Sequence, residues 1–180
     1  AFGFFSINIV VMLLQTVPYL TDNGFTRTEA AYAIVVASIP AMLSKPVWGY
    51  LIDRSPTQPL AALSASLTGV ALACIVFSTT TGELFWVYAA FFLLGFGWGG
   101  MIPMQEVIWA SFFGRRFIGS IRGAAMPFAL ALGAMAPWFS ALYRDAYGDY
   151  GVPFMVVAGL NIISGGLIFF APPPKKLSID

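Results

Sequence analysis

The chain has 180 residues, of which 59% are hydrophobic and only 9% are charged. Charged residues make up about a quarter of a typical soluble domain, so this composition excludes a water-soluble fold and indicates a protein whose solvent is the lipid bilayer. Nine Lys and Arg residues against eight Asp and Glu residues give a formal net charge of +1, which argues against a nucleic-acid partner.

The residue inventory also argues against catalysis. The sequence contains no histidine, which removes His-based catalytic triads and the commonest metal ligands. Its single cysteine, Cys74, lies in an apolar run and has no partner for an internal disulfide. Neither a P-loop nor a nucleophile elbow is present. We therefore expect a protein that is not an enzyme and that uses no metal and no cofactor.

Six apolar stretches are long enough to span a bilayer, which needs about 20 residues of helix. In chain order they are residues 1–21, 30–52, 55–82, 84–105, 123–143 and 150–174. The connections between them are short, so we expect residues 1–180 to form one six-helix bundle, an all-α polytopic membrane protein. The chain begins with Ala1 inside an apolar run, and we expect it to be part of something longer.

The first stretch carries two amide side chains, Asn8 and Gln15, in otherwise apolar surroundings. Either could hydrogen-bond a substrate or a neighbouring helix, and the sequence leaves both possibilities open. After this stretch, Thr26 and Glu29 have the S/T-x-x-E spacing of a capping box, which predicts the start of the second helix.

The second stretch contains Lys45, eight residues before Asp53 and therefore about 12 Å deeper along a helix. Half a bilayer is only about 15 Å thick. The lysine stem could carry its charge to the interface, or the charge could line a substrate path and require an anionic partner. Depth alone favours neither. Trp48 and Tyr50 are expected to be ordinary interfacial anchors.

The fourth stretch contains a formal G-x-G-x-x-G, but a dinucleotide site also requires a preceding strand and a polar helix start, and neither is predicted here. Gly95 and Gly99 are better explained as a small-x-x-x-small face that lets another helix approach closely. Gly119 and Gly123 repeat this spacing near the fifth stretch. Pro103, Pro127 and Pro137 interrupt the same two helices, as is common where helices slide or line a cavity.

Two charges stand at the expected edges of these stretches. Glu106 ends the fourth and Arg122 precedes the fifth. We expect them to form an ion pair at the membrane edge, of small energetic value; a protonation or gating role is the alternative.

The distribution of basic residues predicts the orientation. Six spans place both chain ends on one side, and most basic residues fall there: Lys45, Arg54, Arg115, Arg116, Arg122, Lys175 and Lys176. Only Arg27 and Arg144 fall on the other side. By the positive-inside rule, the C-terminus is cytoplasmic in a cytoplasmic or plasma membrane.

The segment Gly49-x-Leu51-x-Asp53-Arg54 resembles the G-x-L-x-D-R signature loop of the major facilitator superfamily, without its usual basic tail. Ala141-x-x-x-Asp145 repeats a similar spacing later in the chain, as expected if two three-helix repeats are inverted copies of one another. This resemblance implies the C-terminal half of a twelve-helix transporter whose N-terminal half is missing here. It also implies that Gly49, Asp53 and Arg54 help to hold one conformation, Asp53 by facing the N-terminus of a neighbouring helix, for which the fifth span is the candidate.

Within the superfamily, three further segments are similar to the monocarboxylate transporter and oxalate/formate antiporter branches: 18–26, 113–123 and 145–154. The resemblance also implies that Lys45-Pro46-x-x-Gly49 occupies the place of an Arg-Pro-x-x-Gly that supplies a cation to the substrate carboxylate. Lysine keeps the charge but loses the planar fork of arginine. Ala41 stands where the branch has an acid, so coupling to a proton through such a pair is doubtful.

These observations predict a secondary transporter that moves a small organic anion by alternating access within the lipid bilayer. A monocarboxylate is preferred to oxalate because residues 123–143 offer no second cation. Whether a proton is coupled is left open. The alternative is a six-helix membrane scaffold or sensor that transports nothing.

Overall fold

The computed structural model describes residues 2–114 and 118–171, and its regular structure in these ranges is helical. Six stretches are long and apolar enough to cross a membrane, with α2 and α3 forming one of them. The protein is therefore all-α and polytopic, as the composition predicts. The helices are α1 (Phe2–Asp22), α2 (Arg27–Leu43), α3 (Lys45–Arg54), α4 (Thr57–Thr81), α5 (Leu84–Phe113), α6 (Ile118–Tyr147) and α7 (Gly151–Phe170).

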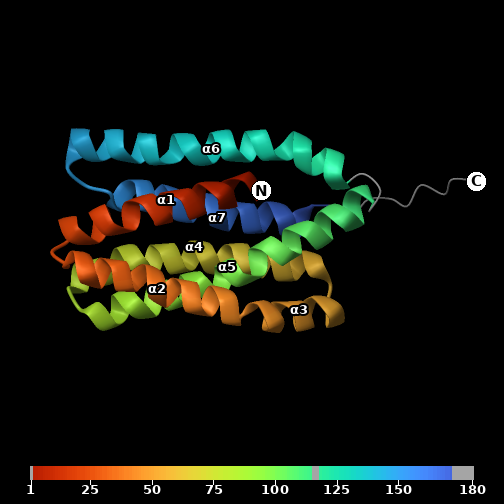
Figure 1. Ribbon diagram of the computed structural model, residues 1–180, viewed down its shortest axis with the longest axis horizontal. Coiled ribbons are helices and arrows are strands. Elements are labelled where there is room, and N and C mark those ends of the chain that lie inside the picture. Colours follow the sequence, from red (N-terminus) through yellow and green to blue (C-terminus); the bar gives the residue numbers. More distant parts are fainter. Residues whose placement is uncertain (1, 115–117, 172–180) are drawn as a thin grey trace, which may run out of the picture.

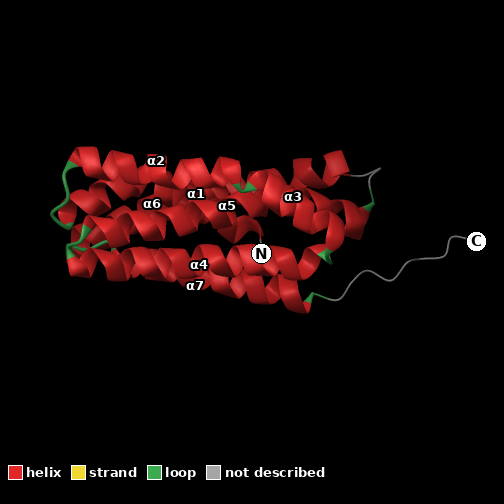
Figure 2. Ribbon diagram, turned by 90° about the horizontal axis from the view of Figure 1, so that it is seen from below, coloured by secondary structure: helices red, strands yellow, loops and turns green. Residues whose placement is uncertain are grey.

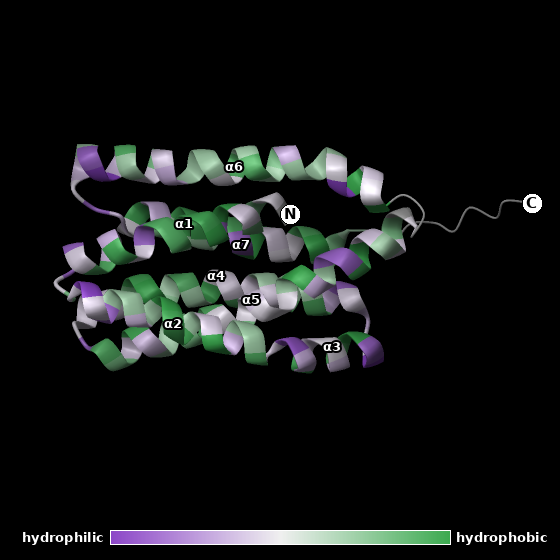
Figure 3. Ribbon diagram, viewed as in Figure 1, coloured by the Kyte–Doolittle hydropathy of each residue, from purple (hydrophilic) through white to green (hydrophobic). Residues whose placement is uncertain are grey.

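The helices lie side by side along one long axis (Figures 1 and 2). The connections that follow α1, α4 and α6 lie together at the left of Figure 1, and we call this the α1–α2 end. The connection from α3 to α4 lies at the opposite end, which we call the α3–α4 end. Apolar residues cover most of the length of the helices, and polar residues gather near both ends, as a bilayer-spanning bundle requires (Figure 3).

The helix contacts relate the first three spans to the last three. We match α1, α2 and α4, in this order, with α5, α6 and α7. The contact between α2 and α5 then corresponds to the contact between α6 and α1. In the same way, the contact between α4 and α5 corresponds to the contact between α7 and α1. All four contacts occur, and α4 packs on its own counterpart, α7. Because each triplet contains three spans, the second begins at the opposite end from the first, which is the arrangement of an inverted repeat.

The helix boundaries differ from the predicted ones at charged residues. The fourth span was expected to end at residue 105 and the fifth to begin at 123, but α5 continues to Phe113 and α6 begins at Ile118. Glu106 and Arg122 therefore lie inside the helices rather than at their edges. They neutralise each other across the α5–α6 interface, so neither charge has to end its helix.

The predicted capping box is present at the start of α2. The Thr26 hydroxyl accepts a hydrogen bond from the Glu29 amide at 3.3 Å, and the Glu29 carboxylate accepts one from the Thr26 amide at 2.8 Å. Two amide groups that the first turn of a helix leaves unpaired are satisfied in this way. At the same end of the molecule, α4 stops at Gly82, whose φ of 69° is a left-handed conformation suited to glycine.

The interface between α4 and α7 joins the two triplets. A Cβ at Gly69 would meet the Ala158 carbonyl at 2.7 Å, and one at Gly165 would meet the Ala62 carbonyl at 2.9 Å, so the two backbones are in close contact. At the α3–α4 end, the Gln58 amide of α4 donates hydrogen bonds to the carbonyls of Ile168 at 2.8 Å and Ala171 at 2.5 Å. Gln58 thereby satisfies carbonyls that the end of α7 cannot pair internally.

Two of the spans are poorly covered by the rest of the chain. In each of α1, α4 and α5, the most apolar 18-residue stretch is 50% buried within the bundle. The corresponding stretch is 28% buried in the span formed by α2 and α3 and 11% buried in α6. Helix α6 lies at the margin of the bundle beside α1 (Figure 1). Most apolar side chains of α6 therefore face outward, among them Leu130, Trp138 and Phe139.

Candidate functional site

Lys45 lies at a break in the second span. Helix α2 ends at Leu43 and α3 begins at Lys45, with the buried Ser44 as the joint. Pro46 has no amide hydrogen, so a continuous helix cannot be fully bonded through this point. The Lys45 side chain is exposed, and in the described part of the chain it makes no ion pair. A cation thus stands unpaired at the N-terminal end of α3, where the helix dipole adds further positive potential.

Trp48 fixes α3 to α5 and is not the interfacial anchor that was expected. Its side chain is 2% exposed, and its indole Nε1 donates a hydrogen bond to the Phe96 carbonyl at 2.9 Å. Gly100 leaves room for the ring, since a Cβ there would lie 2.8 Å from it. One turn earlier, Ser44 also donates to the Phe96 carbonyl, at 3.4 Å. The break beside Lys45 is therefore held from one side by α5.

Gly95 and Gly99 of α5 lie against the same segment. A Cβ at Gly95 would overlap the Ala37 carbonyl and lie 2.8 Å from the Pro40 ring. A Cβ at Gly99 would overlap the Ser44 hydroxyl. By contrast, nothing lies within 4 Å of a Cβ built on Gly119 or Gly123, so these two glycines bring no described helix into close contact.

Asn8 and Gln15 both bond to neighbouring helices. The Asn8 Oδ1 accepts a hydrogen bond from the indole of Trp98 on α5 at 2.8 Å. The Gln15 amide donates to the Pro137 carbonyl on α6 at 2.6 Å. Each residue still has one buried polar atom without a described partner, Nδ2 of Asn8 and Oε1 of Gln15. Both side chains therefore connect helices in this structure and keep one group that could serve a ligand or a water molecule.

Gly49, Asp53 and Arg54 lie on α3 near the α3–α4 end. Arg54 stacks over the ring of Tyr50, with its guanidinium carbon 4.3 Å from the ring centroid. Asp53 is exposed and makes no hydrogen bond or ion pair with other described residues. Helix α3 packs chiefly on α5, and no described contact brings Asp53 to the start of α6. Arg115, Arg116, Lys175 and Lys176, which were used to predict orientation, lie outside the described residues.

Glu106 and Arg122 come together as predicted and line a cavity. The Arg122 Nη1 lies 3.1 Å from the Glu106 Oε1. The cavity has a volume of about 490 Å³ and is bounded by α1, α5 and α6. Its other polar lining includes Ser6 and Gln105, neither of which the sequence singled out. Gln105 could have been found from its place beside Glu106 on the same helix face, but nothing in the sequence marks Ser6.

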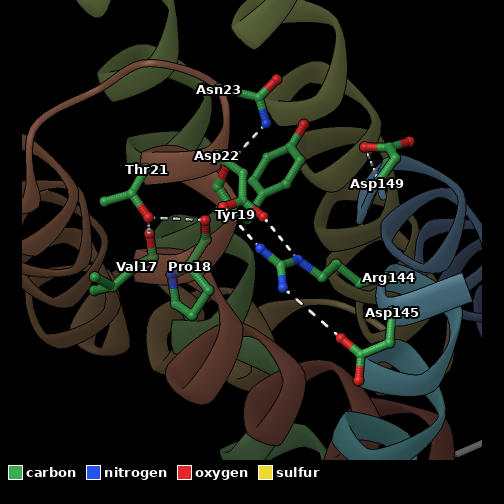
Figure 4. Close-up of polar contacts among 10 residues, drawn as sticks. Val17, Pro18, Tyr19, Thr21, Asp22, Asn23, Arg144, Asp145 and Asp149 are labelled. Atoms are coloured by element: carbon green, nitrogen blue, oxygen red, sulfur yellow. Dashed lines mark hydrogen bonds and ion pairs between the residues drawn. The ribbon is translucent and has the colours of Figure 1, made fainter. Parts of the chain in front are cut away.

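A second cluster of ion pairs lies at the α1–α2 end. Arg144 of α6 meets Asp22 of α1 with two hydrogen bonds, from Nε at 3.1 Å and from Nη2 at 3.3 Å, and lies 3.7 Å from Asp145 (Figure 4). Just beneath it, the buried Tyr19 stacks on Phe154 with ring centroids 4.4 Å apart, and its hydroxyl shares a 2.8 Å hydrogen bond with Thr79. Sequence reasoning used Arg144 only for orientation and missed its pairing with Asp22.

These features define the class of protein: a bundle of six helices long and apolar enough to span a membrane, in two related triplets, with a broken helix, a lysine at the break that pairs with no described residue, and a charged cavity. The sequence model of the Major Facilitator Superfamily matches residues 1–179. The chain belongs to this superfamily, whose members are membrane transporters.

Two curated relatives are similar to most of the chain. It is 27% identical to Monocarboxylate transporter 13 of Rattus norvegicus over 162 residues and 28% identical to Monocarboxylate transporter 13 of Bos taurus over 163 residues. Each alignment covers 89% of this chain and 37% of the relative. The chain thus spans little more than a third of the length of these relatives.

Proposed function

We propose that the chain is the C-terminal six-helix half of a secondary transporter that carries a small organic anion, a monocarboxylate, by alternating access. The superfamily match supports transport in general, and the names of the two relatives favour a monocarboxylate as the substrate. The poor coverage of α2 and α6 favours a further helical bundle, the missing N-terminal half, as the partner that covers them.

The observation that carries the anion proposal is the position of Lys45. An unpaired charge inside a span is costly unless it faces a water-filled path or an anion. Broken helices in secondary transporters direct the positive ends of their half-helices at anionic substrate groups. Lys45 combines both features. It is the first residue of α3, directly after the break at Ser44, and its ammonium group has no described ion-pair partner. We assign Lys45 as the charge partner of the substrate, with Asn8 and Gln15 of α1 as polar neighbours of the path.

The residues near the α3–α4 end have a different proposed role. Gly49, Asp53 and Arg54 lie about 6–14 Å along the helix from Lys45. We assign them to the contact that stabilises one of the two access states, with the partner of Asp53 supplied outside the described residues. The Glu106–Arg122 pair acts in the same conformational step.

The test is uptake of labelled lactate, pyruvate, formate and oxalate into proteoliposomes that contain the full-length protein. Replacing Lys45 by Gln removes the charge at similar length, and we expect the initial rate of monocarboxylate uptake to fall about tenfold or more, the cost of losing one charged hydrogen bond. The matched variant Lys45→Arg keeps the charge and should retain most of the rate. Equal rates for the wild type and Lys45→Gln would remove Lys45 from the site. No uptake above that of empty liposomes would refute the transport proposal.

A further inference from the structure

The break between α2 and α3 is held only weakly by the backbone of its own segment. Pro40 and Pro46 stand on either side of the Ser44 joint, and neither ring nitrogen can donate a hydrogen bond to the preceding turn. Ser44 itself donates to the Pro40 carbonyl at 2.8 Å and accepts from the Trp48 amide at 2.9 Å. The direction in which α3 leaves the joint therefore depends on contacts with other helices.

The carbonyl of Phe96 on α5 receives two side-chain hydrogen bonds from this segment. The Trp48 indole Nε1 donates at 2.9 Å and the Ser44 hydroxyl at 3.4 Å, so the Trp48 bond is the stronger of the two. The rings of Trp48 and Phe96 are also in contact, with centroids 5.4 Å apart. Because Trp48 is buried, loss of its bond would leave a polar group without a replacement partner. This contact therefore fixes the first turn of α3 to α5.

Lys45 lies three residues before Trp48 on the same helix. Residues three apart are neighbours on a helix surface, so Lys45 leaves α3 next to the side that Trp48 buries. The lysine side chain gives little directional control of its own, because it is a point charge on a flexible four-carbon stem. Coulomb attraction falls with distance, and an error of about 1 Å in the placement of a binding group is costly. The position of the ammonium group therefore depends on where the backbone of α3 is held.

We infer that Trp48 is a positioning residue for anion binding. Its hydrogen bond to the Phe96 carbonyl holds the start of α3, and with it Lys45, where the ammonium group can reach the substrate. The inference rests on the proposed function, because it concerns the same site, and it adds a residue that acts through Lys45 instead of touching the anion. Ser44 supports the same placement through its longer bond and should matter less.

The first test measures the position of residue 45 without any substrate. Spin labels are attached to cysteines in place of Lys45 and Glu83 in full-length protein otherwise free of cysteine, and double electron–electron resonance gives the distance between them. Trp48→Phe keeps an aromatic ring and removes the donor, so we expect a broader distribution of distances. Trp138→Phe is the matched control: it alters an exposed tryptophan of α6 and should leave the distribution unchanged.

The second test measures transport by variants that keep Glu83. We expect Trp48→Phe to raise the KM for lactate uptake into proteoliposomes about two- to tenfold, the effect of one neutral hydrogen bond, and to change kcat less than about twofold. Lys45→Gln supplies the discriminating background. Once the charge is gone there is no cation to position, so Trp48→Phe should not slow uptake at low lactate concentration any further. A merely structural role of Trp48 would slow uptake in both backgrounds.

A second variant removes the same hydrogen bond with less change in packing. Benzothienylalanine at position 48 keeps the double ring and replaces the N–H by sulfur, and it is used if the unfolding midpoint shows that Trp48→Phe is not folded. The inference is overturned if loss of the N–H leaves the distances or the KM unchanged, or slows uptake equally with and without Lys45. Absence of uptake by the wild type would refute the proposed function instead, and the distances would still show whether Trp48 places residue 45.

Discussion

Single side chains determine how closely the helices of this protein approach one another. Trp48 and Trp98 each donate an indole N–H across an interface, to the Phe96 carbonyl and to Asn8 respectively. Gly100 leaves space beside the Trp48 ring, and Gly95 and Gly99 leave space for the segment that carries it. Away from water, such a bond is costly to break, since the freed polar group finds no replacement partner.

Substitution of Gly95 by Ala should destabilise the protein by about 1–3 kcal/mol, the usual cost of inserting a methyl group where there is no space. The new Cβ would overlap the Ala37 carbonyl, which is backbone and cannot rotate away. Gly119→Ala is the matched control, because its Cβ meets nothing within 4 Å and should shift stability by no more than about 0.5 kcal/mol. The midpoint of thermal unfolding of the full-length protein in detergent measures both. Equal midpoints would contradict the close contact at Gly95.

The two glycine pairs also show what sequence spacing can predict. Gly95 with Gly99 and Gly119 with Gly123 have the same spacing, yet the structure brings α2 against the first pair and no described element against the second. A small-x-x-x-small pattern permits a close approach but does not name the partner. Gly97 and Gly100, which make room for Thr68 and Trp48, lie outside this pattern and were noted only as part of the formal G-x-G-x-x-G.

At the scale of helices, α6 is attached to the bundle by polar contacts at three levels. Arg122 meets Glu106 near the α3–α4 end, the Pro137 carbonyl receives Gln15 in the middle, and Arg144 meets Asp22 at the α1–α2 end. Apolar packing adds little for this helix, since only 11% of its most apolar window is buried. Polar contacts therefore contribute to its position against α1 and α5 at both ends and in the middle.

Neutralising Asp22 and Arg144 should reveal a coupling of about 1 kcal/mol or less, because both side chains are partly exposed and water screens their attraction. In a double-mutant cycle with Asp22→Asn and Arg144→Gln, the double variant should be less destabilised than the sum of the two single variants. The coupling should shrink as salt is raised toward about 1 M. Strictly additive midpoints of unfolding would show that the pair contributes nothing.

The number of spans could be predicted from apolar run lengths, but two features within them could not. Charges were taken to end a span, so the prediction stopped at Glu106 and resumed after Arg122, whereas the two residues pair and lie inside their helices. The second span was expected to be interrupted only by the charge of Lys45, whereas its helix breaks at Ser44, a joint that depends on how Pro46 and Trp48 meet α5. The first error arose because a charge was taken as the end of a span, although the pairing itself was predicted. The second arose because a single sequence does not show which part of α5 lies opposite Pro46 and Trp48.

For the whole molecule, the contact pattern of the two triplets agrees with the inverted repeat that sequence spacing predicted. The ends also differ in charge. Arg27 and Arg144 stand with five acidic residues in the loops and helix termini of the α1–α2 end: Asp22, Glu29, Glu83, Asp145 and Asp149. The positive-inside rule counts only Lys and Arg, and from the sequence it predicts that the α3–α4 end faces the cytoplasm.

This orientation predicts the accessibility of single cysteines introduced into full-length protein that carries Cys74→Ser. A cysteine in place of Glu83, exposed at the α1–α2 end, should react with a membrane-impermeant maleimide on intact cells. A cysteine in place of Pro56, exposed in the α3–α4 connection, should react only after the cells are permeabilised. The opposite pattern would reverse the assignment, and labelling of both positions on intact cells would contradict a spanning α4.

The α4–α7 interface has a consequence for the synthesis of the protein. Gln58 and the Ile168 carbonyl that it caps are 110 residues apart, and the close contact of Gly69 with Ala158 also joins distant parts of the chain. At roughly 5–20 residues per second, the ribosome delivers α7 roughly 5–20 s after α4. During that interval the face of α4 that packs on α7, with Ala62, Ser66 and Gly69, is in the membrane without its partner. While this half is inserted, lipid or the translocation machinery must therefore cover this face of α4 until α7 is available to pack on it.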